Sequence, residues 1–207
     1  LCQKWRVTLL DLPTAYWHEL VAAMENQSLV FPKAINTVIL GGEAVKREVI
    51  LAWQKRIEGH VQLFNSYGPT EATVVATVEP LHKYSEKQTD VAIGGPLHGR
   101  ALAVVDARMR VLPRGESGEL VLTGAGLAQG YIGSKVTQTA FIHLYLPWCE
   151  QPLRGYRTGD RVVLTGDNRL VYLGRVDNEI KVSGHRIAPQ EIEMALENLA
   201  GIQQAVV

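Results

Sequence analysis

The sequence is short of several features that would assign it to a class at once. Its 207 residues contain two cysteines, Cys2 and Cys149, too few for a disulfide framework, and we expect both to be reduced packing residues in a cytoplasmic protein. No apolar run approaches the ~18 residues of a membrane span. Basic and acidic residues balance at 21 each, so net charge favours neither nucleic acid nor an anionic membrane as a partner. The remaining composition, 46% hydrophobic and 20% charged, is that of an ordinary globular protein.

Two further absences concern metal ligands and the chain ends. The six histidines show no metal-ligand spacing with one another or with cysteine, so we expect structural roles for them. The chain starts at Leu1 without a methionine and stops at the apolar run 203–207 without a polar tail. Natural termini usually fray into polar residues, so we expect a segment of a longer polypeptide.

The first part of the chain alternates strand and helix signals. Helical periodicity predicts helices over about 14–24, with Thr14 as the capping residue, and over about 43–57. Strands are predicted at 6–10, 37–40 and 61–64, and the continuous apolar run 37–40 is typical of a strand buried on both faces. Strands that alternate with helices at this spacing predict a parallel sheet covered by helices.

The pattern changes twice after about Pro80. Many short strands separated by glycine-rich turns predict a small β-barrel-like or distorted sandwich region up to about Gly174. A strand at 178–182, a helix from Pro189 to about Leu199 and a strand from Ile202 predict the start of an α+β domain. The predicted fold is therefore α/β, with a barrel-like second part and a third part that has only begun. The predicted divisions are 1–85, 86–176 and 177–207.

The turn Tyr67-Gly68-Pro69-Thr70-Glu71 is the first stretch whose side chains could bind a ligand or take part in a reaction. It follows a predicted parallel strand, and open α/β sheets bind ligands beyond the carboxyl ends of their strands. Gly68 and Pro69 would present their neighbours rigidly. Tyr67 offers a flat face to a ring, Thr70 a hydroxyl to a phosphate, and Glu71 a hard oxygen to Mg²⁺ held together with phosphates. The alternative is a surface turn with a strand-capping threonine and a solvated glutamate.

Weaker signals lie elsewhere. Gly41-Gly42 would let backbone approach a ligand, or would simply form a tight strand-to-helix turn. The glycine-dense stretch 118–131 does not match a phosphate-binding P-loop, and we interpret it as mainly structural. Asp160 could accept two ribose hydroxyls, and Arg175 could assist or form an ordinary ion pair. Asp177 stands where a hinge between two domains would fall.

The order and spacing of these stretches are more specific than any one of them. The sequence reads NSYGPTEATV, then GELVLTGAGLAQGY, then YRTGD, then GRVDNEIKVSGHRIAPQEIE. This order resembles the adenylate-forming superfamily, and most of all the amino-acid-activating adenylation domain of a nonribosomal peptide synthetase. LPTAYWHEL and VILGGEAV also resemble that subgroup, so the resemblance covers essentially all 207 residues.

The resemblance implies a site for ATP and Mg²⁺. Tyr67 would stack on adenine and Gly42 would lie against it. Thr70 would contact the α-phosphate region and Glu71 would ligate Mg²⁺, which makes these two the catalytic residues. Asp160 would accept the ribose hydroxyls. The implied nucleotide-binding residues are Gly42, Ser66, Tyr67, Thr70, Asp160 and Arg175.

The resemblance also implies a substrate pocket and a moving small domain. Asp177 would be the hinge, and Lys181 and Gly184 would lie on the face that rotates in for the second half-reaction. Asp11 is assigned to the pocket only if a gap is placed in the match to the family pattern, and it could equally be a turn or surface aspartate. The implied pocket residues are Asp11, Ile39, Gly41, Ser66, Val74 and Val75.

The implied chemistry has two steps. A substrate carboxylate attacks the α-phosphorus of ATP and pyrophosphate leaves, after which the phosphopantetheine thiol of a carrier protein takes the acyl group. The implied partners are an amino acid, a peptidyl carrier domain and neighbouring synthetase domains. Two other functions remain open: an acyl- or aryl-CoA ligase of the same superfamily, and a nucleotide-binding or interaction module without catalysis.

The departures from the family pattern are specific. The family's phosphate loop and its amino-binding aspartate are missing and would belong before Leu1, and its catalytic lysine would belong after Val207. Ala188-Pro189-Gln190 differs from the commoner Glu-Leu-Gly. We therefore expect that this chain alone does not adenylate at a normal rate.

Overall fold

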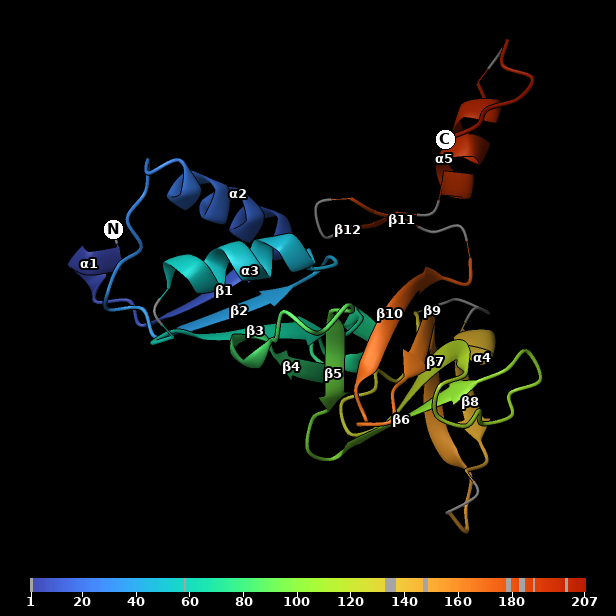
Figure 1. The fold of residues 1–207 in the computed structure, drawn as a ribbon. Helices are drawn as coiled ribbons and strands as arrows, with labels where there is room; N and C mark the ends of the chain where they lie inside the picture. Colours follow the sequence, from blue (N-terminus) through green and yellow to red (C-terminus); the bar gives the residue numbers. More distant parts are fainter. Residues whose placement is uncertain are drawn as a thin grey trace.

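The first part of the chain is a parallel sheet with helices on one face (Figure 1). The computed structural model describes residues 2–57, 59–132, 137–146, 149–177, 180–182, 185–187, 189–199 and 201–207. After the short helix α1 (Cys2–Trp5), the sheet takes in β1 (Leu9–Pro13), β2 (Thr37–Gly41) and β3 (Gln62–Tyr67). Both neighbouring pairs are parallel, and α2 (Thr14–Glu25) and α3 (Arg47–Arg56) form the crossovers. Successive right-handed crossovers place both helices on the same face of the sheet.

The strands of this sheet are buried mainly on the helix-covered face. Val38 and Leu40 of β2 are fully buried, whereas Ile39, which lies between them, and Gly41, which follows Leu40, are only half-buried. The prediction of burial on both faces is therefore wrong for β2 within the described residues. The first strand also begins at Leu9, three residues later than the sequence predicts, and ends directly at α2.

The start of α2 differs from the expected cap. Pro13 is the residue that precedes the helix, and no side chain caps it. The Thr14 hydroxyl instead donates to the carbonyl oxygens of Gly41 at 3.1 Å and Glu43 at 3.2 Å. The buried threonine therefore fixes the loop that leaves β2, which is the loop that carries Gly42.

The remaining strands extend the same sheet by antiparallel pairing. Strand β3 leads through the 3₁₀ turn η1 (Thr70–Ala72) into β4 (Thr77–Pro80), and η2 (Leu81–Lys83) follows. The other strands are β5 (Ala92–Pro96), β6 (Arg100–Val105), β7 (Ser117–Gly124), β8 (Phe141–Leu144), β9 (Leu153–Leu164) and β10 (Leu170–Arg175). A short helix, α4 (Thr137–Ala140), precedes β8.

The ten strands form one open mixed sheet. Their order is β1-β2-β3-β4-β5-β10-β9-β7-β6, with β8 attached to β9. The α/β class with a strand-rich second part is confirmed, but in the described residues the second part does not close into a barrel. Strand β5 pairs with both β4 and β10, so the second part continues the sheet of the first, and β6 ends the strand order.

Three hydrophobic clusters hold the sheet together. The first lies between the sheet and the two helices, where Trp17 and Trp53 are almost fully buried with ring centroids 5.7 Å apart. Burial of one large apolar side chain contributes about 1.5–3 kcal/mol. The second cluster contains Tyr67 and Ala72, so the turn after β3 rests on packed apolar side chains. A third cluster packs between β6, β7 and β8.

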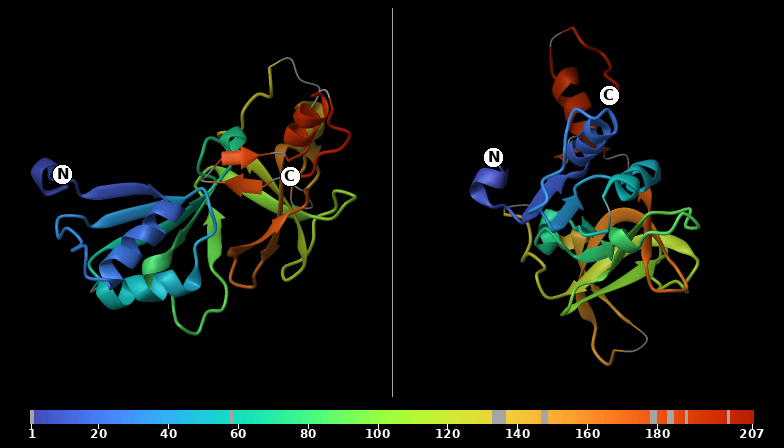
Figure 2. Two further views of the ribbon diagram at one scale, coloured as in Figure 1. Left: turned by 90° about the horizontal axis from the view of Figure 1, so that it is seen from above. Right: turned by 60° about the vertical axis from the view of Figure 1, so that its left-hand side comes forward.

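The end of the chain is a hairpin and a helix (Figure 2). Strands β11 (Ile180–Val182) and β12 (His185–Ile187) are antiparallel, and α5 (Pro189–Glu197) begins at the predicted proline. The predicted strand from Ile202 is not formed in the described residues 201–207, where no neighbouring strand pairs with it. None of the helices described has the length and apolar character to cross a bilayer.

Candidate functional site

The turn after β3 is held in a tight loop. The Ala76 amide donates to the Tyr67 carbonyl oxygen at 2.7 Å, which closes the loop around η1. A Cβ atom on Gly68 would lie 2.5 Å from the Val74 carbonyl oxygen and 2.6 Å from the Ala76 nitrogen, so only glycine fits there. Thr73 and Val74 both have positive φ angles, +53° and +63°, which is uncommon for β-branched residues. The rigid presentation expected of this turn therefore has a physical basis.

Tyr67, Asp160 and Arg175 are joined in one buried network. The Tyr67 hydroxyl donates to the Asp160 carboxylate, and Arg175 Nη1 donates to the other Asp160 oxygen at 3.0 Å. Arg175 also donates to the Thr158 carbonyl oxygen at 2.9 Å and to the Asp177 carboxylate at 2.5 and 2.6 Å. Burial, together with the neighbouring Asp160 charge, raises the pKa of Tyr67 well above its ordinary value, so the phenol stays a donor.

Glu71 is held by the glycine-dense stretch, which the sequence presents as mainly structural. The Tyr131 hydroxyl donates to the Glu71 carboxylate, and the Ala128 amide donates to the Glu71 carbonyl oxygen at 2.8 Å. Beside it, the Thr73 hydroxyl donates to the Gly126 carbonyl oxygen at 2.6 Å. Sequence reasoning missed Tyr131, although the stretch that contains it contributes to the resemblance.

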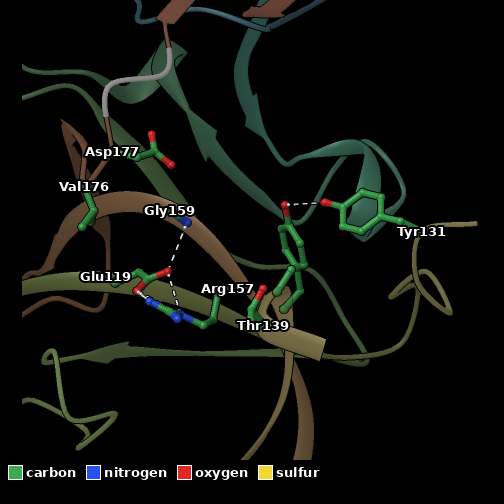
Figure 3. A pocket seen from close by; sticks show the side chains of 9 residues that line it. Glu119, Tyr131, Thr139, Arg157, Gly159, Val176 and Asp177 are labelled. Carbon is green, nitrogen blue, oxygen red and sulfur yellow. Dashed lines mark hydrogen bonds and ion pairs between the residues drawn. The ribbon is translucent and has the colours of Figure 1, made fainter. Parts of the chain in front are cut away.

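A pocket of about 260 Å³ is lined by Tyr131, the partner of Glu71, and by Asp177, the partner of Arg175 (Figure 3). Asp177 and Gly159 line one side and Tyr131 lines the other. Glu119 pairs with Arg157 at 2.7 Å and accepts the Gly159 amide at 3.3 Å. Glu119 was not predicted, and its place in a Gly-Glu-Leu sequence gave no chemical signal. Two lining residues connect the pocket to the predicted site: Tyr131 donates to Glu71, and Gly159 precedes Asp160 in the chain.

The predicted substrate-pocket residues lie mainly on the sheet face that the helices leave open. Asp11 is the register partner of Ile39 on the neighbouring strand. A Cβ atom on Gly41 would lie 2.8 Å from the Ser66 hydroxyl oxygen, which itself donates to the Leu40 carbonyl at 2.7 Å. The structure therefore brings these four residues onto adjacent strands.

The other predicted residues lie outside this group of four on adjacent strands. Gly42 follows the carboxyl end of β2, with φ of +90°, beside the end of β3. Val74 is 70% exposed and Val75 is half-buried, and both lie in the turn between β3 and β4. Lys181 is the register partner of Arg186 in the β11–β12 hairpin, and Gly184 lies outside the described residues.

The described side chains could hold a cation only together with oxygen ligands from a bound substrate and water. Within the described part of the chain, no group of three or more histidine, cysteine, aspartate or glutamate residues could hold a metal ion by itself. The Glu71 carboxylate could supply one hard oxygen ligand. Mg²⁺ is usually held by one or two carboxylates together with substrate phosphates and water, and this donor set agrees with that arrangement.

The comparisons with known proteins agree with this geometry. The chain is 46% identical over 206 residues to an isonitrile lipopeptide synthase of Streptomyces coeruleorubidus, covering 100% of the chain and 13% of that protein. It is 37% identical to an L-allo-isoleucine:holo-[CmaA peptidyl-carrier protein] ligase of Pseudomonas savastanoi pv. glycinea, covering 96% of the chain and 32% of the relative. Holo-PA1221, an NRPS protein with adenylation and PCP domains, superposes with a TM-score of 0.86 at 26% identity, over 98% of this chain and 34% of that one.

Fold, site and relatives together define an adenylation-type ligase fold. The model of the AMP-binding enzyme family matches residues 1–132, more than half of the sequence. The chain belongs to the AMP-binding enzyme family. It spans only 13% and 32% of the length of the two curated relatives, so it corresponds to a part of them.

Proposed function

We propose that this chain is part of an adenylation domain that activates an amino acid with ATP and transfers it to a carrier protein. The carboxylate of the amino acid would attack the α-phosphorus, pyrophosphate would leave, and a mixed anhydride with AMP would form. The phosphopantetheine thiol of the carrier would then take the acyl group and release AMP. The observation that carries the proposal is the convergence of Tyr67, Asp160 and Arg175 beside the turn that contains Glu71.

The nucleoside would be held by groups from distant parts of the chain. Asp160 would accept the two ribose hydroxyls, and the hydrogen bond from Arg175 orients that carboxylate. Tyr67 and Gly42 would border the adenine at the carboxyl ends of β3 and β2. Ser66 would lie between the nucleotide and the substrate pocket.

The phosphates would lie toward η1. Thr70, which is exposed, would donate its hydroxyl near the α-phosphate, and Glu71 would hold Mg²⁺. Such an ion, when bound, neutralises charge that develops on the phosphate oxygens. The protein's own part is to position the reactants and to exclude water from the anhydride.

The amino acid would lie against the open face of the sheet. Asp11, Ile39, Gly41 and Ser66 lie together there, and Val74 and Val75 would complete the pocket. An amino-acid substrate and a carrier partner are supported by the Pseudomonas relative, an L-allo-isoleucine:holo-[CmaA peptidyl-carrier protein] ligase, and by the adenylation and PCP domains of holo-PA1221.

Movement of the small domain would separate the two half-reactions. Asp177, which ends the buried network through Arg175, would be the hinge, with Lys181 and Gly184 on the face that turns in. The three-part division at about residues 85 and 176 is part of the same proposal. Use of ATP and a reduced carrier thiol agrees with a cytoplasmic location.

The test is ATP–pyrophosphate exchange by the complete parent protein. A panel of amino, hydroxy and aryl acids should give exchange with one or a few amino acids. Exchange with hydroxy or aryl acids alone would exclude the peptide-synthetase assignment and favour the acyl- or aryl-CoA ligase. ATP binding without exchange for any acid would favour a non-catalytic module.

A further inference from the structure

We propose that Tyr131 is a positioning residue that orients the Glu71 carboxylate for a divalent cation. This inference rests on the proposed function, because it assigns a role within the same ATP site. Its basis is that one loop, residues 124–131, contacts Glu71 through both its backbone and its side chain.

The loop is attached to the turn at several points along the backbone. The Ala128 amide donates to the Glu71 carbonyl oxygen at 2.8 Å. Arg100 Nη1 donates to the Ala72 carbonyl oxygen at 2.5 Å, and a Cβ atom on Gly126 would lie 2.5 Å from the Arg100 guanidinium. The turn and the loop therefore form one unit, and a shift of the loop would move Glu71.

The tyrosine is itself held from several sides. Its hydroxyl lies 3.5 Å from the Tyr156 hydroxyl, and its ring meets the ring of Phe141 edge-on with centroids 5.9 Å apart. Arg154 lies over the Phe141 ring at 4.5 Å and donates to the Ala128 carbonyl oxygen at 2.7 Å. Although Tyr131 is 36% exposed, its phenol is therefore fixed in direction.

A fixed donor on a carboxylate favours metal binding without blocking it. An ionised carboxylate has two oxygens and about four lone-pair sites, so one hydrogen bond from Tyr131 leaves room for a cation. Groups that orient a ligating carboxylate typically affect metal affinity by about 10–100-fold. Tyr131 therefore acts through Glu71 and need not touch the nucleotide.

The experiment compares Tyr131→Phe with the unaltered protein, both as the complete parent. Mn²⁺ binding in the presence of ATP is followed by electron paramagnetic resonance, and the Mg²⁺ dependence of pyrophosphate exchange is measured in parallel. Tyr145→Phe is the matched control, because Tyr145 is 76% exposed. We expect Tyr131→Phe to weaken Mn²⁺ affinity about 10-fold and to regain its exchange rate at saturating Mg²⁺. Tyr145→Phe should change neither quantity.

Three results would overturn the inference. Unchanged Mn²⁺ affinity would remove the role of Tyr131, and tighter binding would make the tyrosine a competitor of the metal. A rate that saturating Mg²⁺ does not restore would show a structural role alone. The proposed function fails separately, if the unaltered protein gives no exchange with any acid.

Discussion

The Tyr67 hydroxyl donates a hydrogen bond to the Asp160 carboxylate, although 93 positions of sequence separate the two residues. The bond joins the end of a parallel strand to the middle of an antiparallel one. It joins the two kinds of sheet at the point where we place the nucleotide. Tyr67→Phe should lower ATP affinity about 10-fold, since a hydrogen bond to a charged group contributes about 1.5–3 kcal/mol.

The control for that variant is Tyr16→Phe, because Tyr16 is 60% exposed and lies on helix α2. Equilibrium binding of ATP to the complete protein measures both. Equal affinities for the two variants would show that the Tyr67 hydroxyl does not order the site.

Asp160→Asn should destabilise the protein as well as weaken nucleotide binding. The Asp160 and Arg175 side chains are only 4% and 7% exposed, and removal of one partner from a buried pair costs about 3–5 kcal/mol. Asp167→Asn is the matched control, because Asp167 pairs with Arg169 at a site where the Asp167 side chain is 58% exposed. Exposed ion pairs of this kind contribute little to stability, because water screens the charges. The midpoint of thermal unfolding should fall clearly for Asp160→Asn and little for Asp167→Asn, and the reverse order would contradict the buried network.

Gly68→Ala should disrupt the turn that carries Glu71. The added Cβ would meet the Val74 and Ala76 backbone at 2.5–2.6 Å, and overpacking of this kind costs about 1–3 kcal/mol. Gly166→Ala has open space around the new Cβ and no positive φ, so it controls for the substitution itself. Pyrophosphate exchange should drop for Gly68→Ala and stay unchanged for Gly166→Ala. Normal exchange by Gly68→Ala would mean that the tight loop is not needed.

Glu79 should give stability a distinct pH dependence. Burial raises the pKa of this carboxyl above its ordinary 4.5, although Arg169 acts in the opposite direction. The folded state therefore binds a proton more tightly than the unfolded state, so this stabilisation is complete below about pH 4.5 and is lost as pH rises through the folded pKa. The unfolding midpoint of the unaltered protein, relative to Glu79→Gln, should fall as pH rises above 4.5.

Asp167 should change stability with pH in the opposite direction to Glu79, and it serves as the comparison. Hydrogen bonds from Thr165 and Arg169 lower the pKa of Asp167, so its contribution is lost as pH falls. Parallel pH profiles for Glu79→Gln and Asp167→Asn would contradict the burial argument for Glu79.

The local sequence pattern predicted where helices and strands lie better than it predicted which strands pair with one another. The apolar run 37–40 and Pro189 placed β2 and α5 almost as observed, because burial and backbone geometry act there over a few residues. The barrel expectation did not hold for the described residues, because β5 pairs with β10 across more than seventy positions and no local signal encodes that pairing. A strand such as the one expected from Ile202 also needs a neighbour to pair with.

In the candidate site, too, residues with a local sequence signal were predicted, and residues that depend on long-range contacts were not. Tyr67, Glu71, Asp160 and Arg175 stand out in the sequence because polar groups follow strands and turns, and the structure brings them to one region. Tyr131 escaped notice because its contact with Glu71 spans 60 positions and depends on how the 124–131 loop docks. The left-handed conformation of Val74 was equally hidden, since valine disfavours it and the closed loop imposes it.

The most direct measurement is a crystal structure of the complete protein with ATP and Mg²⁺ bound. We predict that the ribose hydroxyls lie within hydrogen-bond distance of Asp160, with the phosphates and the metal at Glu71. A nucleotide bound elsewhere, with Asp160 and Glu71 both out of contact with it, would contradict the account.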